Sequence, residues 1–133
     1  MDWYQTLLGY LNQSNQRIIV NLQGRRAWCL SRLVEMQAMQ DSILLSNEGD
    51  IVSSIPFSKA EMLLGQETGT VVYDGFSGIN IDVLCMAVGL IRAGGVLFFI
   101  TPENFEQMED VYGRWQGRVN RQPYFLRYLF QHL

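Results

Sequence analysis

Histidine and cysteine are scarce in this sequence of 133 residues. The single histidine, His132, is the penultimate residue, so a catalytic triad built on histidine is not expected. The two cysteines, Cys29 and Cys85, lie far apart in apolar stretches and form neither a disulfide framework nor a zinc-binding motif. The sequence therefore favours a reducing compartment and predicts no metal site.

Lysine is also rare, and basic residues are not in excess. Lys59 is the only lysine beside nine arginines, and the net charge is −3. A domain that binds nucleic acid by itself usually carries a basic surplus, because neutralising phosphates supplies most of the non-specific affinity. Local patches remain as candidate contacts, but solvated charge is the favoured interpretation of each; they are Arg25 with Arg26, and Arg114 with Arg118 and Arg121.

Long apolar runs are absent. The most apolar windows, 83–91 and 96–100, are separated by Arg92 and Gly94-Gly95, and neither reaches the roughly 20 residues that a membrane helix needs. The first three residues, Met-Asp-Trp, do not resemble the basic start of a signal peptide. We therefore expect a cytoplasmic protein that does not contact the membrane.

The residues that are present alternate between helical and strand patterns. Hydrophobic residues make up 48% and charged residues 17%, which is typical of one globular domain, here 1–133. Helices are predicted over 3–13, 25–40, 59–64, 80–92, 103–116 and 124–133, and strands over 17–22, 42–46, 70–74 and 96–100. Strands that are apolar throughout and separated by helices indicate an α/β fold, with a mostly parallel sheet of about four strands and helices on both faces.

Several of these helices carry recognisable ends. Ser58 with Glu61 fits a capping box at the start of the short third helix. Asn80 is predicted to cap the next helix, which should end at Gly94-Gly95. Residues 117–122 are the best candidate for a linker.

In an open α/β sheet, ligands bind beyond the carboxyl ends of the strands. The first loop there contains Gly24 and Arg25, which could place a phosphate at the start of the following helix. A dinucleotide fingerprint would need three glycines. A plain turn glycine with solvated arginines is the favoured alternative.

The second loop runs from Asp74 to Gly78. Asp74 could bind a ribose or a metal, but capping of its own loop is the favoured role. Ser77 and Gly78 complete the candidate ligand-binding residues of this edge, and the loop glycines would permit a positive φ or a close approach of a partner. In the third loop, Glu103 could be an acid, although a cap by Thr101 or Asn104 explains the same residues.

No catalytic residues are predicted. The sequence has no Gly-x-Ser-x-Gly elbow and no phosphate-binding loop that ends in Gly-Lys-Ser/Thr. The chain by itself is therefore not expected to be an enzyme or to hold a cofactor.

The last predicted helix is unusually apolar, and part of its surface should stay exposed and form an interface. The interface candidates are Tyr124, Phe125, Tyr128, Leu129 and Phe130. A following domain and a homodimer contact are both compatible with this pattern.

One ordered set of short motifs resembles a known family. Leu-Gly-Gln-Glu at 64–67 precedes Val-Val-Tyr-Asp at 71–74, then Gly78, then Arg-Ala-Gly-Gly-Val-Leu at 92–97, and finally Thr-Pro at 101–102. In this order and spacing the chain resembles the N-terminal, Rossmann-like domain of bacterial tRNA(Met) cytidine acetyltransferases. The resemblance covers roughly residues 17–133.

The resemblance implies a function for a larger protein. The full enzyme uses acetyl-CoA and hydrolysis of ATP or GTP, with Mg²⁺, to acetylate N4 of the wobble cytidine in elongator methionine tRNA. Its helicase-like and acetyltransferase modules lie downstream, so residues 117–133 would be a linker and a helix leading toward a missing module.

No catalytic residue carries over to this chain. The resemblance implies an accessory domain that packs on the helicase-like module and helps position tRNA. A small nucleotide-binding module and a dimeric interaction domain remain the alternatives.

Overall fold

The computed structural model describes residues 2–36, 38–39 and 41–103. In chain order, the helices and strands are Asp2–Ser14 (α1), Ile18–Gln23 (β1), Arg26–Glu35 (α2), Ser42–Leu45 (β2), Phe57–Leu63 (η1), Thr68–Asp74 (β3), Gly75–Ser77 (η2), Ile81–Leu90 (α3) and Ile91–Thr101 (β4), where η marks a 3₁₀ helix. The predicted linker at 117–122 and the predicted helix over 124–133 lie outside the described residues, as does the predicted helix over 103–116 beyond Glu103.

The four strands form one parallel sheet in the order β1-β4-β3-β2. β4 lies between β1 and β3, where Val20 pairs with Phe98 and Phe98 with Val72. Because all strands run the same way, their carboxyl ends meet at one edge of the sheet. The predicted α/β architecture, with a parallel sheet of four strands, is confirmed.

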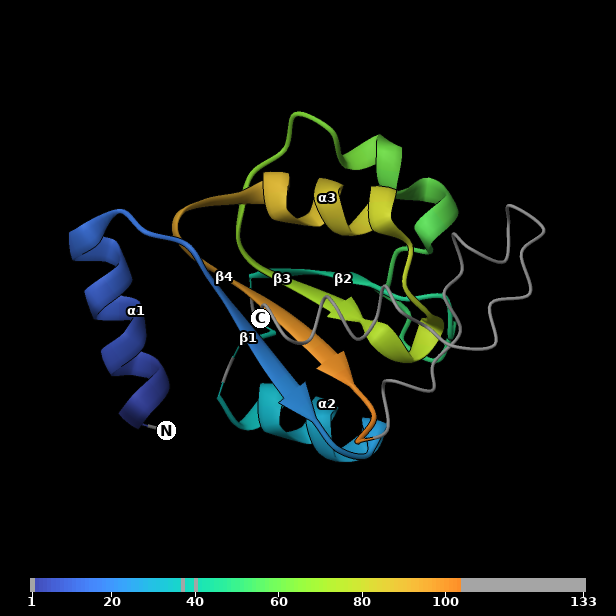
Figure 1. Cartoon of the computed structure of the whole chain (residues 1–133), viewed down its shortest axis with the longest axis horizontal. Coiled ribbons are helices and arrows are strands. Elements are labelled where there is room, and N and C mark those ends of the chain that lie inside the picture. Colours follow the sequence, from blue (N-terminus) through green and yellow to red (C-terminus); the bar gives the residue numbers. More distant parts are fainter. Residues whose placement is uncertain (1, 37, 40, 104–133) are drawn as a thin grey trace.

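Helices cover both faces of the sheet, with α2 and α3 on opposite sides (Figure 1). On one face, residues of α1 and α2 such as Tyr4 and Leu33 pack against Phe98. On the other face, residues of η1 and α3 such as Phe57 pack against Tyr73. Side chains of a strand alternate between faces, so central strands that are apolar throughout fill both layers.

Two helix ends differ from their predictions. α2 stops at Glu35 instead of reaching residue 40, because the Ala38 amide donates to the Leu33 carbonyl at 3.0 Å and so closes the last turn. The third helix is the 3₁₀ helix η1, and Pro56 precedes it with no capping side chain. The capping box at Ser58 is therefore wrong: the Phe57 amide instead binds Oδ1 of Asn47, from a distant loop, at 2.8 Å.

The boundary between α3 and β4 also differs. The Asn80 cap is confirmed, since its Oδ1 accepts from the amides of Asp82 and Val83. The helix ends at Leu90, however, and Ile91 already pairs with Thr68 of β3. The register then shifts between Thr68 and Thr70, so the segment around Gly94-Gly95 bulges within the strand entry instead of ending the helix.

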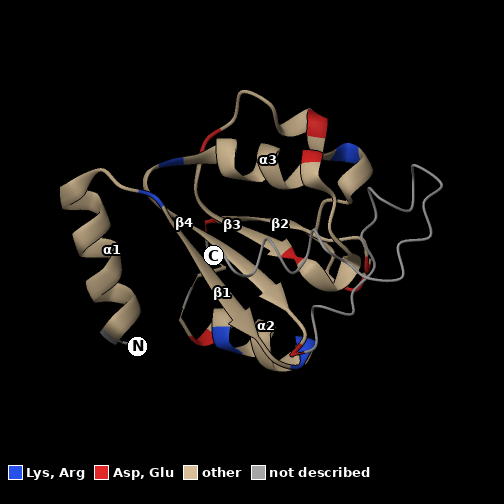
Figure 2. Cartoon of the chain, in the orientation of Figure 1, with Lys and Arg blue, Asp and Glu red and all other residues tan. Residues whose placement is uncertain are grey.

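Basic residues are spread over the described part of the chain and do not gather on one face (Figure 2). None of the helices in that part combines the length and the apolar character that crossing a membrane requires.

Candidate functional site

Asp74 lies at the carboxyl end of β3 and is fully buried. Among the described residues it is the only buried side chain that carries a charge. Its Oδ1 accepts a hydrogen bond from the Phe76 amide at 3.0 Å, which caps the short helix η2. The favoured sequence interpretation, a loop cap, is confirmed.

The second carboxylate oxygen of Asp74 binds two further donors. Nε of Arg26 lies 2.9 Å from Oδ2, and the Ser46 hydroxyl lies 2.8 Å from the same atom. Arg26 begins α2 and Ser46 follows β2, so one carboxylate joins three separate parts of the carboxyl edge. A buried carboxylate needs such partners, since an unpaired buried charge is strongly unfavourable.

Arg26 continues the network toward the surface. Its two terminal nitrogens bind both carboxylate oxygens of Asp50, as a two-pronged ion pair. The hydrogen bonds to Asp50 and then to Asp74 raise the pKa of Arg26, and the bond from Arg26 lowers the pKa of Asp50. The expectation that Arg26 is a solvated charge is therefore wrong, because its guanidinium is held by two acids on different loops.

Arg25 and Gly24 lie just before α2. Arg25 is the residue that precedes the helix, its side chain is exposed and it makes no capping bond. Gly24 is buried with φ +155°, and a Cβ there would lie 3.0 Å from the Trp28 ring. The structure thus connects the loop after β1 to the loop after β3 through Arg26 and not through Arg25.

Two glycines shape the second loop, and the positive φ expected of this loop is confirmed at one of them. Gly78 adopts φ +94°, the left-handed region that glycine tolerates. Gly75 has no room for a side chain, since a Cβ would lie 2.4 Å from the backbone oxygen of Ile100. Tyr73 fixes the end of this loop: its hydroxyl donates to the Gly78 carbonyl at 3.1 Å and accepts from the Asn80 amide at 2.9 Å.

Ser77 links this loop to the loop after β2. Its hydroxyl oxygen accepts from the Asn47 amide at 2.9 Å and donates to Oε1 of Glu48 at 3.3 Å. The third loop is arranged differently. The buried Thr101 accepts from the side-chain amide of Asn21 at 3.1 Å, while Glu103 is exposed.

Asp74 and its three donors, Arg26, Ser46 and the Phe76 amide, form a closed cluster that we call the Asp74 clamp. Both oxygens of the Asp74 carboxylate have donors, so a ribose or a cation could approach it only by displacing Arg26, Ser46 or the Phe76 amide. In the described part of the chain, no three acidic, cysteine or histidine side chains come together as metal ligands. The nearby Cys29 thiol is buried, and burial followed by the charge of Asp74 raises its pKa.

Sequence reasoning missed Ser46, Arg26 and Asp50 as members of this cluster. The available signal was the loop after β2, where Glu48 and Asp50 follow the strand and could pair with an arginine at the same edge. The interface candidates Tyr124, Phe125, Tyr128, Leu129 and Phe130 lie outside the described residues.

Comparison with protein families gives one match over the whole chain. The profile of the family described as "tRNA(Met) cytidine acetyltransferase TmcA, N-terminal" matches residues 1–133.

Individual relatives carry the same description, tRNA(Met) cytidine acetyltransferase TmcA. The protein of Haemophilus influenzae is 39% identical over 80 residues, which cover 58% of this chain and 12% of that protein. The protein of Pectobacterium atrosepticum is 33% identical over 90 residues, 65% of this chain and 13% of that protein. The protein of Photorhabdus asymbiotica is 30% identical over 114 residues, 84% of this chain and 16% of that protein. The chain thus spans less than a fifth of the length of these relatives.

Proposed function

From the fact that this chain belongs to the family of N-terminal domains of tRNA(Met) cytidine acetyltransferases, we propose that it is a non-catalytic accessory domain of such an enzyme. In this role it packs on the helicase-like module of the same polypeptide and helps position tRNA. The parent enzyme acetylates N4 of the wobble cytidine of elongator methionine tRNA, and acetyl-CoA, ATP and Mg²⁺ bind to its other modules.

The observation that carries this proposal is the clamp around Asp74. At the edge where α/β sheets ordinarily hold ligands, the buried carboxylate is bound by Arg26, Ser46 and the Phe76 amide. These bonds tie α2, β2 and η2 together and leave the carboxylate to hold the fold. A domain built in this way suits a structural role beside catalytic modules.

The exposed face of α1 supports packing against a neighbouring module. Trp3 and Tyr10 lie seven residues apart, on one side of the helix, with 44% and 59% of their surfaces exposed. Aromatic side chains are enriched in protein interfaces, where they supply large contact areas.

A chimeric enzyme tests the accessory role. In the Haemophilus influenzae relative, the matching N-terminal region is deleted or replaced by this chain, and acetylcytidine in methionine tRNA is measured by mass spectrometry. We expect the deletion to lower kcat/KM for tRNA at least tenfold and the chimera to restore most of it. A chimera with Trp3→Ala and Tyr10→Ala should restore less. A chimera with Met62→Ala, an exposed apolar residue of η1 on the other face of the sheet, is the control.

The purified chain alone provides the second arm of the test. We expect neither ATP hydrolysis nor acetyl transfer by this chain. Turnover by the chain that Asp74→Asn abolishes would contradict the proposal and make this domain an enzyme.

A further inference from the structure

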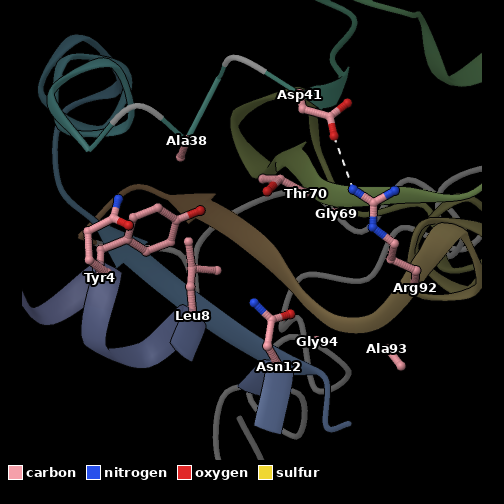
Figure 3. A pocket seen from close by; sticks show the side chains of 11 residues that line it. Tyr4, Leu8, Asn12, Ala38, Asp41, Gly69, Thr70, Arg92, Ala93 and Gly94 are labelled. Atoms are coloured by element: carbon pink, nitrogen blue, oxygen red, sulfur yellow. Dashed lines mark hydrogen bonds and ion pairs between the residues drawn. The ribbon is translucent and has the colours of Figure 1, made fainter. Parts of the chain in front are cut away.

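A second feature lies at the opposite edge of the sheet from Asp74. A cavity of about 300 Å³ opens between α1, the connection from α2 to β2, and the starts of β3 and β4 (Figure 3). Ala38, Gly69 and Gly94 form part of its wall, and the side chains of Arg92 and Asn12 lie against the two glycines. The cavity is distinct from the clamp at the carboxyl edge.

Two mostly buried side chains line the cavity, and their hydroxyl groups have no hydrogen-bond partner among the described residues. Tyr4 is 3% exposed and Thr70 is 7% exposed, and neither hydroxyl takes part in the hydrogen bonds of the described residues. In the same part of the chain, every fully shielded side-chain nitrogen or oxygen has a partner, so these two oxygens must reach the open space. Figure 3 shows the Tyr4 hydroxyl directed from α1 toward Thr70 at the start of β3.

The position of the Tyr4 hydroxyl is set by packing. The Tyr4 ring lies against Phe98 of β4, with the ring centroids 5.7 Å apart, and against Trp3 at 6.0 Å. Thr70 is held in β3 by its pairing with Val96. Two polar groups that are held in place and lack partners are what a ligand site needs before its ligand arrives.

The rim of the cavity carries balanced charge. Arg92 donates to Asp41 at 3.1 Å, and the two side chains are 51% and 80% exposed. Because the carboxylate neutralises the guanidinium, the rim does not favour a phosphate or another strong anion. Asn12 adds an amide, which can both donate and accept, beside Gly94.

We propose that this cavity binds one neutral nucleobase. A base presents donors and acceptors along its edge, which match the hydroxyls of Tyr4 and Thr70 and the amide of Asn12. Its flat apolar faces match Leu8 and Ala38 on the cavity wall. The volume lies at the lower end of the range for ligand pockets, so it suits a single base and excludes a whole dinucleotide or acetyl-CoA.

The base can come from a free nucleoside or from single-stranded RNA. Binding of a base from RNA rests on the proposed role in tRNA positioning. Binding of a base as such rests only on the residues that line the cavity. The purified chain is therefore titrated with cytidine, uridine, adenosine and guanosine, and separately with a short single-stranded RNA and its abasic counterpart. Ribose 5-phosphate serves as the ligand without a base, and amide chemical shifts report the site of binding.

Matched variants remove one hydroxyl at a time. Tyr4→Phe keeps the ring on Phe98, and Thr70→Val keeps the side-chain shape, so both should fold; circular dichroism checks this. We expect each to raise the Kd about three- to tenfold, the range for the loss of one hydrogen bond. Tyr10→Phe and Thr6→Val make the same chemical changes on exposed positions of α1 and should leave the Kd unchanged.

Each outcome decides the proposal. Binding of nucleosides, or of RNA but not abasic RNA, that weakens in Tyr4→Phe and Thr70→Val supports it and identifies the source of the base. The absence of binding to every base at millimolar concentration overturns it. It is also overturned if ribose 5-phosphate binds as tightly as the nucleosides, or if both variants bind them as tightly as the unsubstituted chain. These results leave the chimera experiment unaffected, so a failure of the cavity proposal is distinguishable from a failure of the accessory role.

Discussion

Nε of Arg26, in the first turn of α2, donates to Oδ2 of the buried Asp74, at the end of β3, over a distance of 2.9 Å. The two residues are 48 positions apart in the sequence. The bond joins the helix after the first strand to the loop after the third, and the terminal nitrogens of Arg26 extend it to Asp50. The Asp74 carboxylate therefore holds two loops together at the carboxyl edge of the sheet, where ligands bind in many α/β proteins.

Removal of the guanidinium should therefore destabilise the fold. We expect Arg26→Ala to lower the free energy of unfolding by about 2–4 kcal/mol, because it leaves a buried carboxylate without its charged partner. Arg25→Ala, at the exposed neighbouring position, should change it by less than about 0.5 kcal/mol. Urea unfolding followed by circular dichroism measures both. Equal effects of the two substitutions would show that the ion pair does not hold the edge together.

The Tyr73 phenol predicts a loss of stability at alkaline pH. Burial raises the pKa of Tyr73 above its usual value near 10. Above about pH 10 the unfolded chain releases this proton while the folded chain retains it, so the free energy of unfolding should fall with a limiting slope of about 1.4 kcal/mol per pH unit from this group. The contribution of the protonated Tyr73 to the free energy of unfolding is fully present below pH 10 and is lost progressively as the pH rises above it.

Tyr73→Phe separates this effect from other alkaline effects. The variant should be less stable at neutral pH by about 1–2 kcal/mol, because the Asn80 amide and the Gly78 carbonyl lose their partner. It should also show a shallower decline above pH 10. Urea unfolding at several pH values gives both quantities, and identical slopes for the two proteins would contradict the assignment to Tyr73.

The two cysteines should differ in reactivity. Cys29 is fully buried in α2, and burial raises the pKa of its thiol, whereas Cys85 is exposed on α3. A disulfide reagent at pH 8 should label one thiol rapidly in the native protein and two after denaturation. Cys85→Ala should abolish the rapid phase. Rapid labelling of Cys29 in the Cys85→Ala variant would show that α2 opens readily.

Two glycines should respond in opposite directions to the same substitution. At Gly75 a Cβ would lie 2.4 Å from the Ile100 backbone oxygen, so Gly75→Ala should cost about 2 kcal/mol or more. Gly89 lies in α3 with nothing within 4 Å of the added carbon. Gly89→Ala should stabilise by about 0.5–1 kcal/mol through helix propensity. Thermal unfolding compares the two variants. An unchanged stability of Gly75→Ala would show that the close contact with the Ile100 oxygen does not exclude a side chain at this position.

Much of the local structure could be predicted from the sequence because it depends on neighbouring residues. Apolar runs identified all four strands that the structure describes, and the strand predicted at 96–100 lies inside β4. The Asn80 cap and the Asp74 loop cap were predicted because each side chain binds amides two or three residues away. Interactions of this range are encoded in short windows of sequence.

The tertiary structure alone decided which distant residues meet. The strand order places β4 between β1 and β3, and no local pattern specifies that order. The start of β4 at Ile91 depends on pairing with Thr68. Helical spacing predicted a longer helix there because the pairing of a strand with a distant strand leaves no trace in the helical spacing.

The parallel α/β class and the caps by Asn80 and Asp74 were thus determined by the sequence itself. The closed clamp of Asp74 with Arg26 and Ser46, and the open cavity beside Tyr4 and Thr70, were determined only by folding. The physical reason is the same for both. Each forms at an edge of the sheet where side chains from separate helices and strands meet. Which of these side chains find hydrogen-bond partners depends on how the whole domain packs.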